Sequence, residues 1–469
     1  MIALTLREIA SAMRGELILG TSGATEDTII SGLTDTDSRL ITPGDIFVAK
    51  PGEVTDGHLF ADKAIANGAA LLIVDHALDV EVPQIVVDDT VIAMGLLATR
   101  VVAKVRALGK LKVVGITGSN GKTTTKNLVG AMCSRVGPTI YPRDSFNNEV
   151  GAPITMLRVT EDTEFLVLEL GASKPGHITR LTDMVRPDIA VVLMIGLAHA
   201  GEFGGIETTI SSKRELVESL DSEGITILNA DDPRVLSMLE AAPGAVTLFG
   251  HSPQADVRIS DLNSSIAGTT FTLTFPDGSA HPVVFRVLGE HHVMNAAAAA
   301  SVGLALGFDA QLIVSALESV EMAEKGRMQL LGNDDIVIIN DAYNASPDSM
   351  AAALKTLRQI ATDDHRTIAV LGEMAELGEF SGEEHDRIAL LIVRLGIDQL
   401  VVVGDRARRL HISAINEGSW DGESEFFSEQ EQAYDYLSNL LDAGDIVLVK
   451  SSNSAGLRFL AEKLGEAYA

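Results

Sequence analysis

The pattern of apolar residues along the chain predicts short buried strands that alternate with helices. Strongly apolar runs recur, and segments of helical composition separate them. The runs lie at 113–116, 165–168, 189–194, 225–228, 336–339, 367–371, 399–403 and 446–449. Strands that are apolar throughout and are joined through helices are typical of parallel sheets covered on both faces. We therefore predict an α/β fold.

Breaks in this alternation divide the chain into three units, which we place at 1–109, 110–320 and 321–469. The pattern of the first unit predicts helices at 6–13 and 94–107 and strands at 45–49 and 70–74. The second and third units contain the apolar runs, so each is predicted to hold a parallel sheet. A length of 469 residues suits three domains of roughly 150 residues each.

The segment 257–287 differs from the rest of the central unit. Apolar and polar residues alternate through Thr269–Phe275, and a Pro276-Asp277-Gly278 turn follows. Alternation with a period of two beside such a turn predicts an antiparallel hairpin. Two helices are predicted after the hairpin, at 295–306, where alanine is abundant, and at 310–317.

The composition indicates a folded protein with an excess of acidic residues. Sixty-five Asp and Glu residues against 36 Lys and Arg residues give a formal charge of −29. A surface this acidic repels a phosphate backbone, so we expect no nucleic-acid partner. Hydrophobic residues make up 46% of the chain and charged residues 22%, which supplies a large core and argues against disorder.

Cysteine use and the length of the apolar stretches favour the cytoplasm. The single cysteine, Cys133, cannot form an intrachain disulfide, and no basic N-terminus leads into an apolar signal segment. Apolar stretches such as 189–198 and 296–306 fall short of the roughly 20 residues that span a bilayer. We expect a cytoplasmic protein without a transmembrane segment.

The strongest chemical signal follows the apolar run at 113–116. There Thr117-Gly118-Ser119-Asn120-Gly121-Lys122-Thr123-Thr124 leads from a strand through a glycine turn into a helix. Glycines let successive backbone N–H groups face one anion, Lys122 adds a positive charge, and Thr123 is suited to ligate Mg²⁺. This arrangement predicts a site for a nucleoside triphosphate. Its spacing is not that of a strict Walker A motif, because Gly115 lies six rather than five residues before Gly121. A chance Gly-Lys-Thr turn would not require the strand before it and the helix after it.

Two polar residues follow central strands at the edge of the sheet where this loop opens. Glu169 ends the run at 165–168, and His199 lies just past the run at 189–194. The carboxyl ends of parallel strands share one edge, where ligands bind. Each residue alone suits an ordinary strand end as well as a metal ligand, and the shared edge favours the ligand. Lys213 alone has the setting of a solvated helix lysine.

Several motifs, in the same order along nearly the whole chain, resemble the Mur ligases, which are ATP-dependent amide-forming enzymes of peptidoglycan precursor synthesis. They are the loop at 117–124, Glu169, His199, Lys213, Asn229-Ala230-Asp231-Asp232-Pro233, Gly289-Glu290-His291-His292-Val293-Met294-Asn295-Ala296-Ala297 and Gly326-Arg327. The resemblance implies a small N-terminal α/β domain, a central P-loop domain with a parallel sheet and a C-terminal Rossmann-like domain. Hinge closure near 318–326 would bring the last domain over the P-loop.

The resemblance also implies roles for individual residues. Those that would contact ATP are Gly118, Asn120, Gly121, Lys122, Thr123, Thr124, Asn295, Arg327, Asp341 and Asn344. Those that would hold Mg²⁺, with two ions expected, are Thr123, Glu169, His199 and Lys213. The catalytic set would be Lys122, Glu169, His199 and Lys213. Lys213 resembles a lysine that is carbamylated in this family, which turns an ammonium that would repel Mg²⁺ into a carboxylate-like ligand.

Within the family, four segments are most similar to the branch that joins D-alanyl-D-alanine to UDP-N-acetylmuramoyl-tripeptide. They are 145–151, 199–204, 341–350 and 371–378. The resemblance implies these two small-molecule substrates and an acyl-phosphate route, in which ATP activates the tripeptide carboxylate before the dipeptide amine attacks. The third residue of the tripeptide stays open between meso-diaminopimelate and lysine. We expect a monomer.

Two regions resemble contacts to the nucleotide-sugar substrate. The N-terminal motifs at 37–39, 43–49 and 56–58 resemble the uridine-diphosphate-binding domain of the family. Ser38 and Arg39 are the candidates there, because a guanidinium suits a pyrophosphate, although both also suit an ordinary loop. Asn147 and Asn148 are the candidates in the central unit.

Three positions depart from the family pattern. Met194-Ile195-Gly196 stands where many members place an Asn, and His292 stands where Asn is common. Lys450-Ser451-Ser452-Asn453-Ser454 replaces a frequent Lys-Gly-Ser-Arg, and Asn453 cannot offer the bidentate positive charge of Arg. The residues that contact the dipeptide therefore stay unassigned.

Three alternatives share part of these features. The diamino-acid-adding branch uses the same chemistry, but its Asp-Asn-Pro-Arg motif is not found in the C-terminal unit, and Asp231-Asp232-Pro233-Arg234 lies in the central one. Folylpolyglutamate synthase has a similar P-loop but lacks this type of N-terminal domain. The third alternative is a nucleotide sensor that catalyses no ligation. It predicts that phosphate release from ATP does not depend on the UDP-linked tripeptide or the dipeptide.

Overall fold

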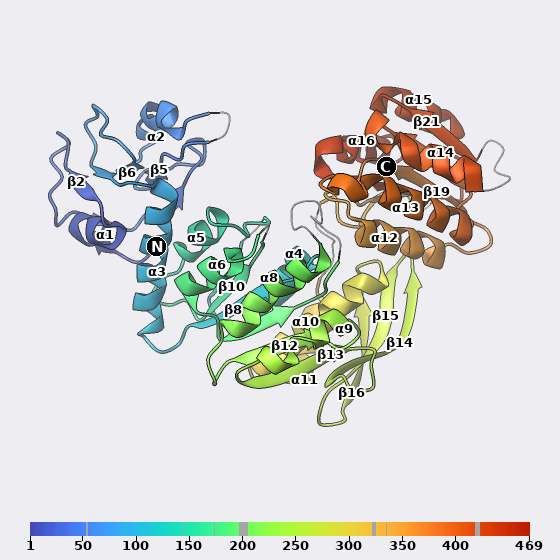
Figure 1. The fold of residues 1–469 in the computed structure, drawn as a ribbon, viewed down its shortest axis with the longest axis horizontal. Helices are drawn as coiled ribbons and strands as arrows, with labels where there is room; N and C mark the ends of the chain where they lie inside the picture. Colours follow the sequence, from blue (N-terminus) through green and yellow to red (C-terminus); the bar gives the residue numbers. More distant parts are fainter. Residues whose placement is uncertain are drawn as a thin grey trace.

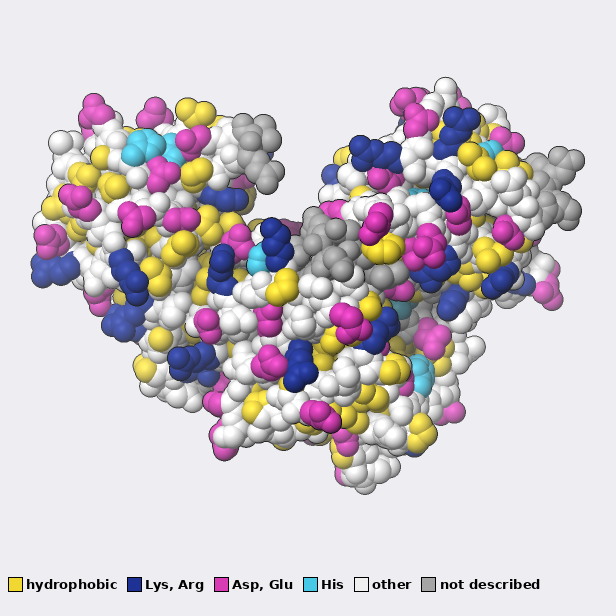
Figure 2. Space-filling model, in the orientation of Figure 1, with side chains coloured by type: hydrophobic (Ala, Val, Ile, Leu, Met, Phe, Trp, Pro, Cys, Tyr) yellow, Lys and Arg dark blue, Asp and Glu magenta, His cyan; other side chains and the backbone are white. Residues whose placement is uncertain are grey.

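The computed structural model describes residues 1–52, 55–142, 144–172, 174–196, 205–320, 325–333, 335–417 and 423–469. Three α/β bodies follow one another along the chain (Figure 1). The N-terminal body, in blue, and the C-terminal body, in orange and red, stand on opposite sides of the central body, and the space-filling view shows an open gap between them (Figure 2). The α/β fold and the three-domain architecture predicted from the sequence are confirmed.

The N-terminal body is built on a small mixed sheet. In spatial order its strands are β2 (Glu16–Ile18), β7 (Gln84–Val86), β6 (Leu71–Val74), β5 (Ile46–Val48) and β4 (Thr34–Asp35), and β1 (Leu4–Thr5) pairs with β3 (Ile29–Ile30). Its helices are α1 (Leu6–Met13), η1 (Gly57–Phe60), α2 (Ala61–Ala66) and α3 (Thr90–Arg106). α3 begins earlier than the predicted position 94, because the Asp89 carboxylate accepts hydrogen bonds from the N–H groups of Val91 and Ile92 and so caps the helix.

The central body carries the largest sheet. In spatial order its described strands are β16 (Ala280–Phe285), β15 (Gly268–Thr274), β14 (Val257–Ser265), β13 (Ala245–Gly250), β12 (Ile225–Asn229), β11 (Ile189–Val192), β8 (Lys112–Thr117), β10 (Phe165–Glu169) and β9 (Thr139–Ile140). The strands from β9 to β14 are parallel, and β14, β15 and β16 are antiparallel. The predicted hairpin at 257–287 is therefore confirmed, and it extends the same sheet.

Helices cover both faces of this sheet. The described helices are α4 (Lys122–Cys133), α5 (Gly151–Met156), α6 (His177–Val185), α8 (Ile206–Glu218), α9 (Pro233–Leu236), η2 (Leu239–Ala241), α10 (Glu290–Ala305) and α11 (Ala310–Glu318). Neighbouring strand residues point to opposite faces, so Val113 packs with α3, α5 and α6, whereas Val114 packs with α4, α10 and α11. α10 begins at Glu290 after Gly289, not at the predicted Asn295, which lies in its second turn.

The C-terminal body repeats the parallel arrangement. Its strands are β17 (Gln329–Gly332), β18 (Ile336–Asn340), β22 (Asp445–Lys450), β19 (Arg366–Leu371), β20 (Gln399–Val403) and β21 (Ser424–Phe427), with β17 antiparallel to β18. Its helices are α12 (Pro347–Ile360), η3 (Gly378–Phe380), α13 (Ser381–Leu395), η4 (Asp405–Ala407), α14 (Arg408–Glu417), α15 (Gln430–Leu440), η5 (Asn453–Ala455) and α16 (Leu457–Ala467). Among the described residues, none of the helices is long and apolar enough to cross a membrane.

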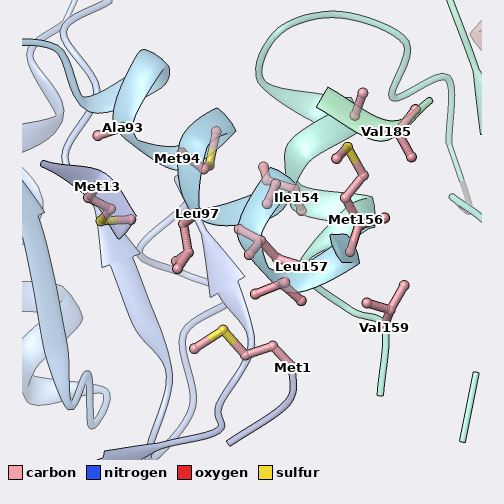
Figure 3. Packing of buried hydrophobic residues seen from close by; sticks show 14 of the residues in the cluster. Met1, Met13, Ala93, Met94, Leu97, Ile154, Met156, Leu157, Val159 and Val185 are labelled. Atoms are coloured by element: carbon pink, nitrogen blue, oxygen red, sulfur yellow. The ribbon is translucent and has the colours of Figure 1, made fainter. Parts of the chain in front are cut away.

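The N-terminal and central bodies share one hydrophobic core. Met94 and Leu97 of α3 lie in the same buried cluster as Met156 and Leu157 at the end of α5, and Figure 3 shows Ile154 and Leu157 on the side of α5 that lies beside α3. The main clusters of the C-terminal body are separate, although one takes in Leu288 from the central body. Apolar burial therefore fixes the first two bodies to each other more firmly than the third.

Asp188 adds a polar clamp to this joint. Its carboxylate accepts a hydrogen bond from the N–H of Val113 at 2.7 Å and one from the Arg106 guanidinium at 3.0 Å, so it ties the end of α3 to the start of β8. We expect Asp188→Ala to lower the free energy of unfolding by about 1–3 kcal/mol, because it leaves a backbone N–H without its acceptor. Urea unfolding followed by circular dichroism measures the change. Glu161→Ala, which removes an exposed carboxylate from the same body, is the control, and equal midpoints for the two variants would contradict the clamp.

Candidate active site

The glycine loop joins β8 to α4 and exposes the N-terminus of that helix. Gly121 precedes α4 with a φ of 85°, and no side chain caps the first turn. A Cβ on Gly121 would overlap the side-chain amide oxygen of Asn295. The Lys122 Nζ folds back and donates to the carbonyls of Gly118 at 2.8 Å and Ser119 at 3.3 Å. Uncapped backbone N–H groups beside a lysine form a site for phosphate.

Glu169 lies at the end of β10, beside this loop, and is completely buried. Its two carboxylate oxygens accept hydrogen bonds from three side chains. The donors are Thr123 Oγ1 at 2.9 Å, Ser145 Oγ at 2.7 Å and Asn147 Nδ2 at 2.8 Å. The ends of β8 and β10 are level, since Glu169 pairs with Ile116, as expected for residues at one edge of a parallel sheet.

Lys213 is buried on α8, with 3% of its surface exposed, so the solvated helix lysine suggested by its local sequence is wrong. Burial, together with a smaller effect of the nearby Lys122, lowers the pKa of Lys213 to about 7, although Glu215 and Glu169 partly oppose the shift. Burial also lowers the pKa of Lys122, which Glu169 partly opposes. At neutral pH a substantial fraction of an amine with a pKa of about 7 is neutral, and the neutral amine is the nucleophilic form.

The C-terminal body supplies the opposite wall of the site. The Arg327 Nη2 donates to Thr123 Oγ1 at 3.1 Å, and its guanidinium lies over the Tyr343 ring, 4.2 Å from the centroid. Asp341 accepts a hydrogen bond from Lys450 Nζ at 2.6 Å and another from the N–H of Met328 at 3.1 Å. Ser346 Oγ donates to Asn120 Oδ1 at 3.2 Å. The two bodies thus meet directly at the glycine loop.

These residues enclose a pocket of about 240 Å³. Its lining includes the predicted residues Asn120, Gly121, Lys122, Thr123, Thr124, Asn147, Glu169, Asn295, Arg327, Asp341 and Asn344. Gly118 forms the turn below it, with a φ of 154°. Thr123 and Arg327, which are more than 200 positions apart in the sequence, therefore line one hollow.

Some predicted residues lie elsewhere. Ser38 is buried in the N-terminal body and Arg39 is exposed, where it pairs with Asp37 at 2.6 Å, and neither lines the pocket. Asn148 accepts hydrogen bonds from the N–H groups of Val150 and Gly151 and so shapes the start of α5. His199 lies outside the described residues.

The pocket also contains residues to which no role was assigned from the sequence. They are Ser119, Ser145, His291, His292, Gly326, Tyr343, Ser349 and Lys450. Most belong to the motifs that carry the family resemblance, and their side-chain directions become apparent only in three dimensions. Burial lowers the pKa of His291 to about 4 and that of His292 well below its usual value, so both rings are neutral.

Met194-Ile195-Gly196, where the chain departs from the family pattern, is held to the loop through its backbone. The N–H of Ser119 donates to the carbonyl of Met194 at 2.9 Å, and the N–H of Gly196 donates to Ser119 Oγ at 2.8 Å. The Asn229 amide donates to the carbonyl of Leu193 at 2.8 Å and steadies the same segment. The contact between this strand end and the P-loop is thus made without a side-chain amide at 194–196.

The polar groups that line this pocket suit a nucleoside triphosphate with bound Mg²⁺. Backbone N–H groups, Lys122 and Arg327 offer positive charge to phosphate oxygens. Hydroxyl and carboxylate oxygens of Thr123 and Glu169 are ligands that Mg²⁺ prefers. The geometry therefore fits a nucleotide whose phosphates lie between the central and C-terminal bodies.

Comparison with known proteins places the whole chain in one family. Residues 32–107 match the family model described as Mur ligase family, catalytic domain, residues 116–303 match the Mur ligase middle domain, and residues 326–453 match the Mur ligase, glutamate ligase domain. Curated relatives named UDP-N-acetylmuramoyl-tripeptide--D-alanyl-D-alanine ligase include that of Mycobacterium tuberculosis, 38% identical over 99% of this chain and 98% of its own length, and that of Escherichia coli, 35% identical over 99% of both.

Solved structures give the same result. A crystal structure of MurF from Acinetobacter baumannii is 32% identical, covers 99% of both chains and superposes with a TM-score of 0.88. MurF from Thermotoga maritima in complex with ADP is 26% identical, covers 94% of this chain and 99% of its own, and has a TM-score of 0.80. Because identity above 30% extends over the full length and the complete fold is shared, the chain belongs to the Mur ligase family.

Proposed function

We propose that the protein is an ATP-dependent ligase that joins D-alanyl-D-alanine to UDP-N-acetylmuramoyl-tripeptide and forms the pentapeptide precursor of peptidoglycan. The observation that carries this proposal is the contact of Arg327 with Thr123, beside the Glu169 carboxylate and the P-loop. This contact supports the proposal because groups of two domains line one hollow, as a reaction between ATP and other bound substrates requires. The names of the full-length relatives supply the substrates.

The reaction needs activation because a carboxylate is a poor electrophile. A carboxylate oxygen of the tripeptide attacks the γ-phosphorus of ATP, the bond to the β-phosphate oxygen breaks, and ADP leaves. The amine of D-alanyl-D-alanine, after losing a proton, then attacks the acyl carbon, and phosphate leaves with the electrons of the C–O bond. Lys122, Arg327 and the N-terminus of α4 bind the phosphoryl oxygens and hold them in line, so positioning is the main task of the protein.

We propose that Thr123, Glu169, His199 and Lys213 hold Mg²⁺, with two ions in the site. The oxygen donors of Thr123 and Glu169 fit this ion. Bound Mg²⁺ would neutralise charge on the phosphate oxygens. Lys213 fits a carbamate, because its burial favours the neutral amine that reacts with carbon dioxide.

The remaining proposals concern the substrates, domains and location. Ser38 and Arg39 would contact the UDP moiety, and Asn147 would orient the tripeptide end beside Glu169. Asn148 supports that segment through its side-chain oxygen, which accepts hydrogen bonds from the N–H groups of Val150 and Gly151. We place the domain limits at 109/110 and 320/321, with closure at the second junction, of which residues 321–324 lie outside the described part. The protein would act in the cytoplasm. It would act as a monomer, since one chain supplies all residues of the nucleotide pocket described above.

Phosphate release from ATP tests the proposed function. We expect release only when UDP-N-acetylmuramoyl-tripeptide and D-alanyl-D-alanine are both present, together with a product whose mass equals that of the two joined less one water. Phosphate release from ATP that is the same with and without the two substrates would favour a nucleotide sensor. Product formed from the dipeptide precursor and a diamino acid would favour the diamino-acid-adding branch.

Lys213 gives a second test. We expect Lys213→Ala to lose activity by about 100-fold or more and to regain part of it with added formate or acetate, because a short carboxylate can replace the carbamate oxygens. Lys355→Ala, at an exposed position of α12, is the control, which neither loses activity nor responds to carboxylates. Full activity of Lys213→Ala in carboxylate-free buffer would contradict the carbamate.

Gly121 gives a third test. We expect Gly121→Ala to weaken ATP binding by roughly 10-fold or more, because the new Cβ overlaps Asn295 and displaces the N-terminus of α4 from the phosphates. Isothermal titration with ATP and Mg²⁺ measures the effect. Gly278→Ala is a matched control: its φ of 82° carries the same backbone strain of about 1–2 kcal/mol, but its Cβ meets open space. Equal ATP affinities for the two variants would contradict the steric argument.

A further inference from the structure

A second pocket, of about 420 Å³, opens beside the nucleotide pocket. Both are lined by Thr123, Ser145, Gly326 and Tyr343, so the two spaces adjoin at the phosphate end of the site. The second pocket extends from there toward α16, where Arg458, Phe459 and Glu462 line it. A molecule bound in it would reach the P-loop threonine with one end and α16 with the other.

The charged groups of this pocket suit a short zwitterion. Asp144 and Glu462 provide negative charge, and Lys325 and Arg458 provide positive charge. Asp144 precedes Ser145, which donates to Glu169 at 2.7 Å, so Asp144 belongs to the phosphate end. Arg458 and Glu462 belong to the α16 end, and Lys325, which precedes the shared Gly326, belongs to the phosphate end. Each end therefore carries both signs, and a zwitterion with its ammonium beside Asp144 and its carboxylate beside Arg458 meets an opposite charge at each end.

Arg458 is oriented by two neighbours. Its Nη1 donates to Asn453 Oδ1 at 3.1 Å, and its guanidinium lies over the Phe459 ring, 4.6 Å from the centroid. A guanidinium has five N–H donors, and a bidentate pair with a carboxylate uses two of them. Asn453 is also the position where the chain lacks the arginine that is frequent in the family. Arg458, in the first turn of α16, thus places a guanidinium beside Asn453, whose own side chain has none.

We propose that this pocket binds the incoming dipeptide, with Arg458 holding its C-terminal carboxylate and Asp144 facing its amino group. The assignment rests on the proposed ligase function and adds a specificity-determining residue to it. It directs the amine toward Thr123, where the activated carboxyl group of the tripeptide must lie. It also predicts that a dipeptide with a free carboxylate is preferred, since a blocked C-terminus would leave Arg458 without its anion.

The test compares D-alanyl-D-alanine with its C-terminal amide as substrates of the wild-type protein and of Arg458→Gln. We expect the wild type to prefer the free acid by roughly 10- to 100-fold in kcat/KM, and Arg458→Gln to lose this preference through a higher KM for the acid. The kcat at saturating dipeptide and the KM for ATP should stay within about threefold of wild type. Arg458→Lys should recover only part of the preference, because it lacks the planar fork.

Arg408→Gln is the matched control, since Arg408 also lies over a phenylalanine ring, that of Phe426, but does not line the pocket. It should keep the wild-type preference for the acid. Equal use of acid and amide by the wild type, or an equal loss on both substrates in Arg458→Gln, would overturn the assignment while leaving the ligase function intact. If the wild type forms no ligation product with either the free dipeptide or its C-terminal amide, the ligase function itself is overturned, and the assignment with it.

Discussion

The buried carboxylate of Glu169 is the interaction on which the rest of the site depends. A fully buried anion is costly unless polar groups surround it, and here three side chains from two segments donate to its two oxygens. Thr123 belongs to the P-loop helix, whereas Ser145 and Asn147 belong to the segment before α5. One carboxylate therefore fixes the distance between the phosphate site and the neighbouring segment, and Arg327 joins the same network through Thr123.

The three domains are held together by different forces, and this difference has functional consequences. The N-terminal and central domains share a continuous apolar core, so a nucleotide sugar bound across them would keep a constant position relative to the P-loop. The C-terminal domain meets the loop through polar contacts such as those of Arg327 and Ser346. Polar contacts exchange with water at little net cost, so this interface can open for substrates and close around them.

The sequence predicted the sheets and the P-loop well because those features depend on local pattern. Apolar runs placed most of the parallel strands, and the glycines around Lys122 located the phosphate site. Helix starts were less predictable, because Asp89 and Gly289 set them through capping and turn geometry rather than through periodicity. The burial of Lys213 and the contact between Lys450 and Asp341 depend on chain segments that meet only in the folded protein, so no local pattern indicates them.

The acidity of the chain raises a physical problem for a protein whose proposed substrates are anions. A formal charge of −29 gives an unfavourable long-range field, and Figure 2 shows acidic side chains scattered over all three bodies, with Lys and Arg side chains between them. At the pocket the sign is reversed by Lys122, Arg327 and the N-terminus of α4, within a low-dielectric wall where charges act strongly. Until phosphate arrives, the carbonyls of Gly118 and Ser119 hold the Lys122 ammonium. Binding then exchanges weak carbonyl acceptors for a phosphate anion, so local geometry favours the substrate although the net charge of the protein opposes it.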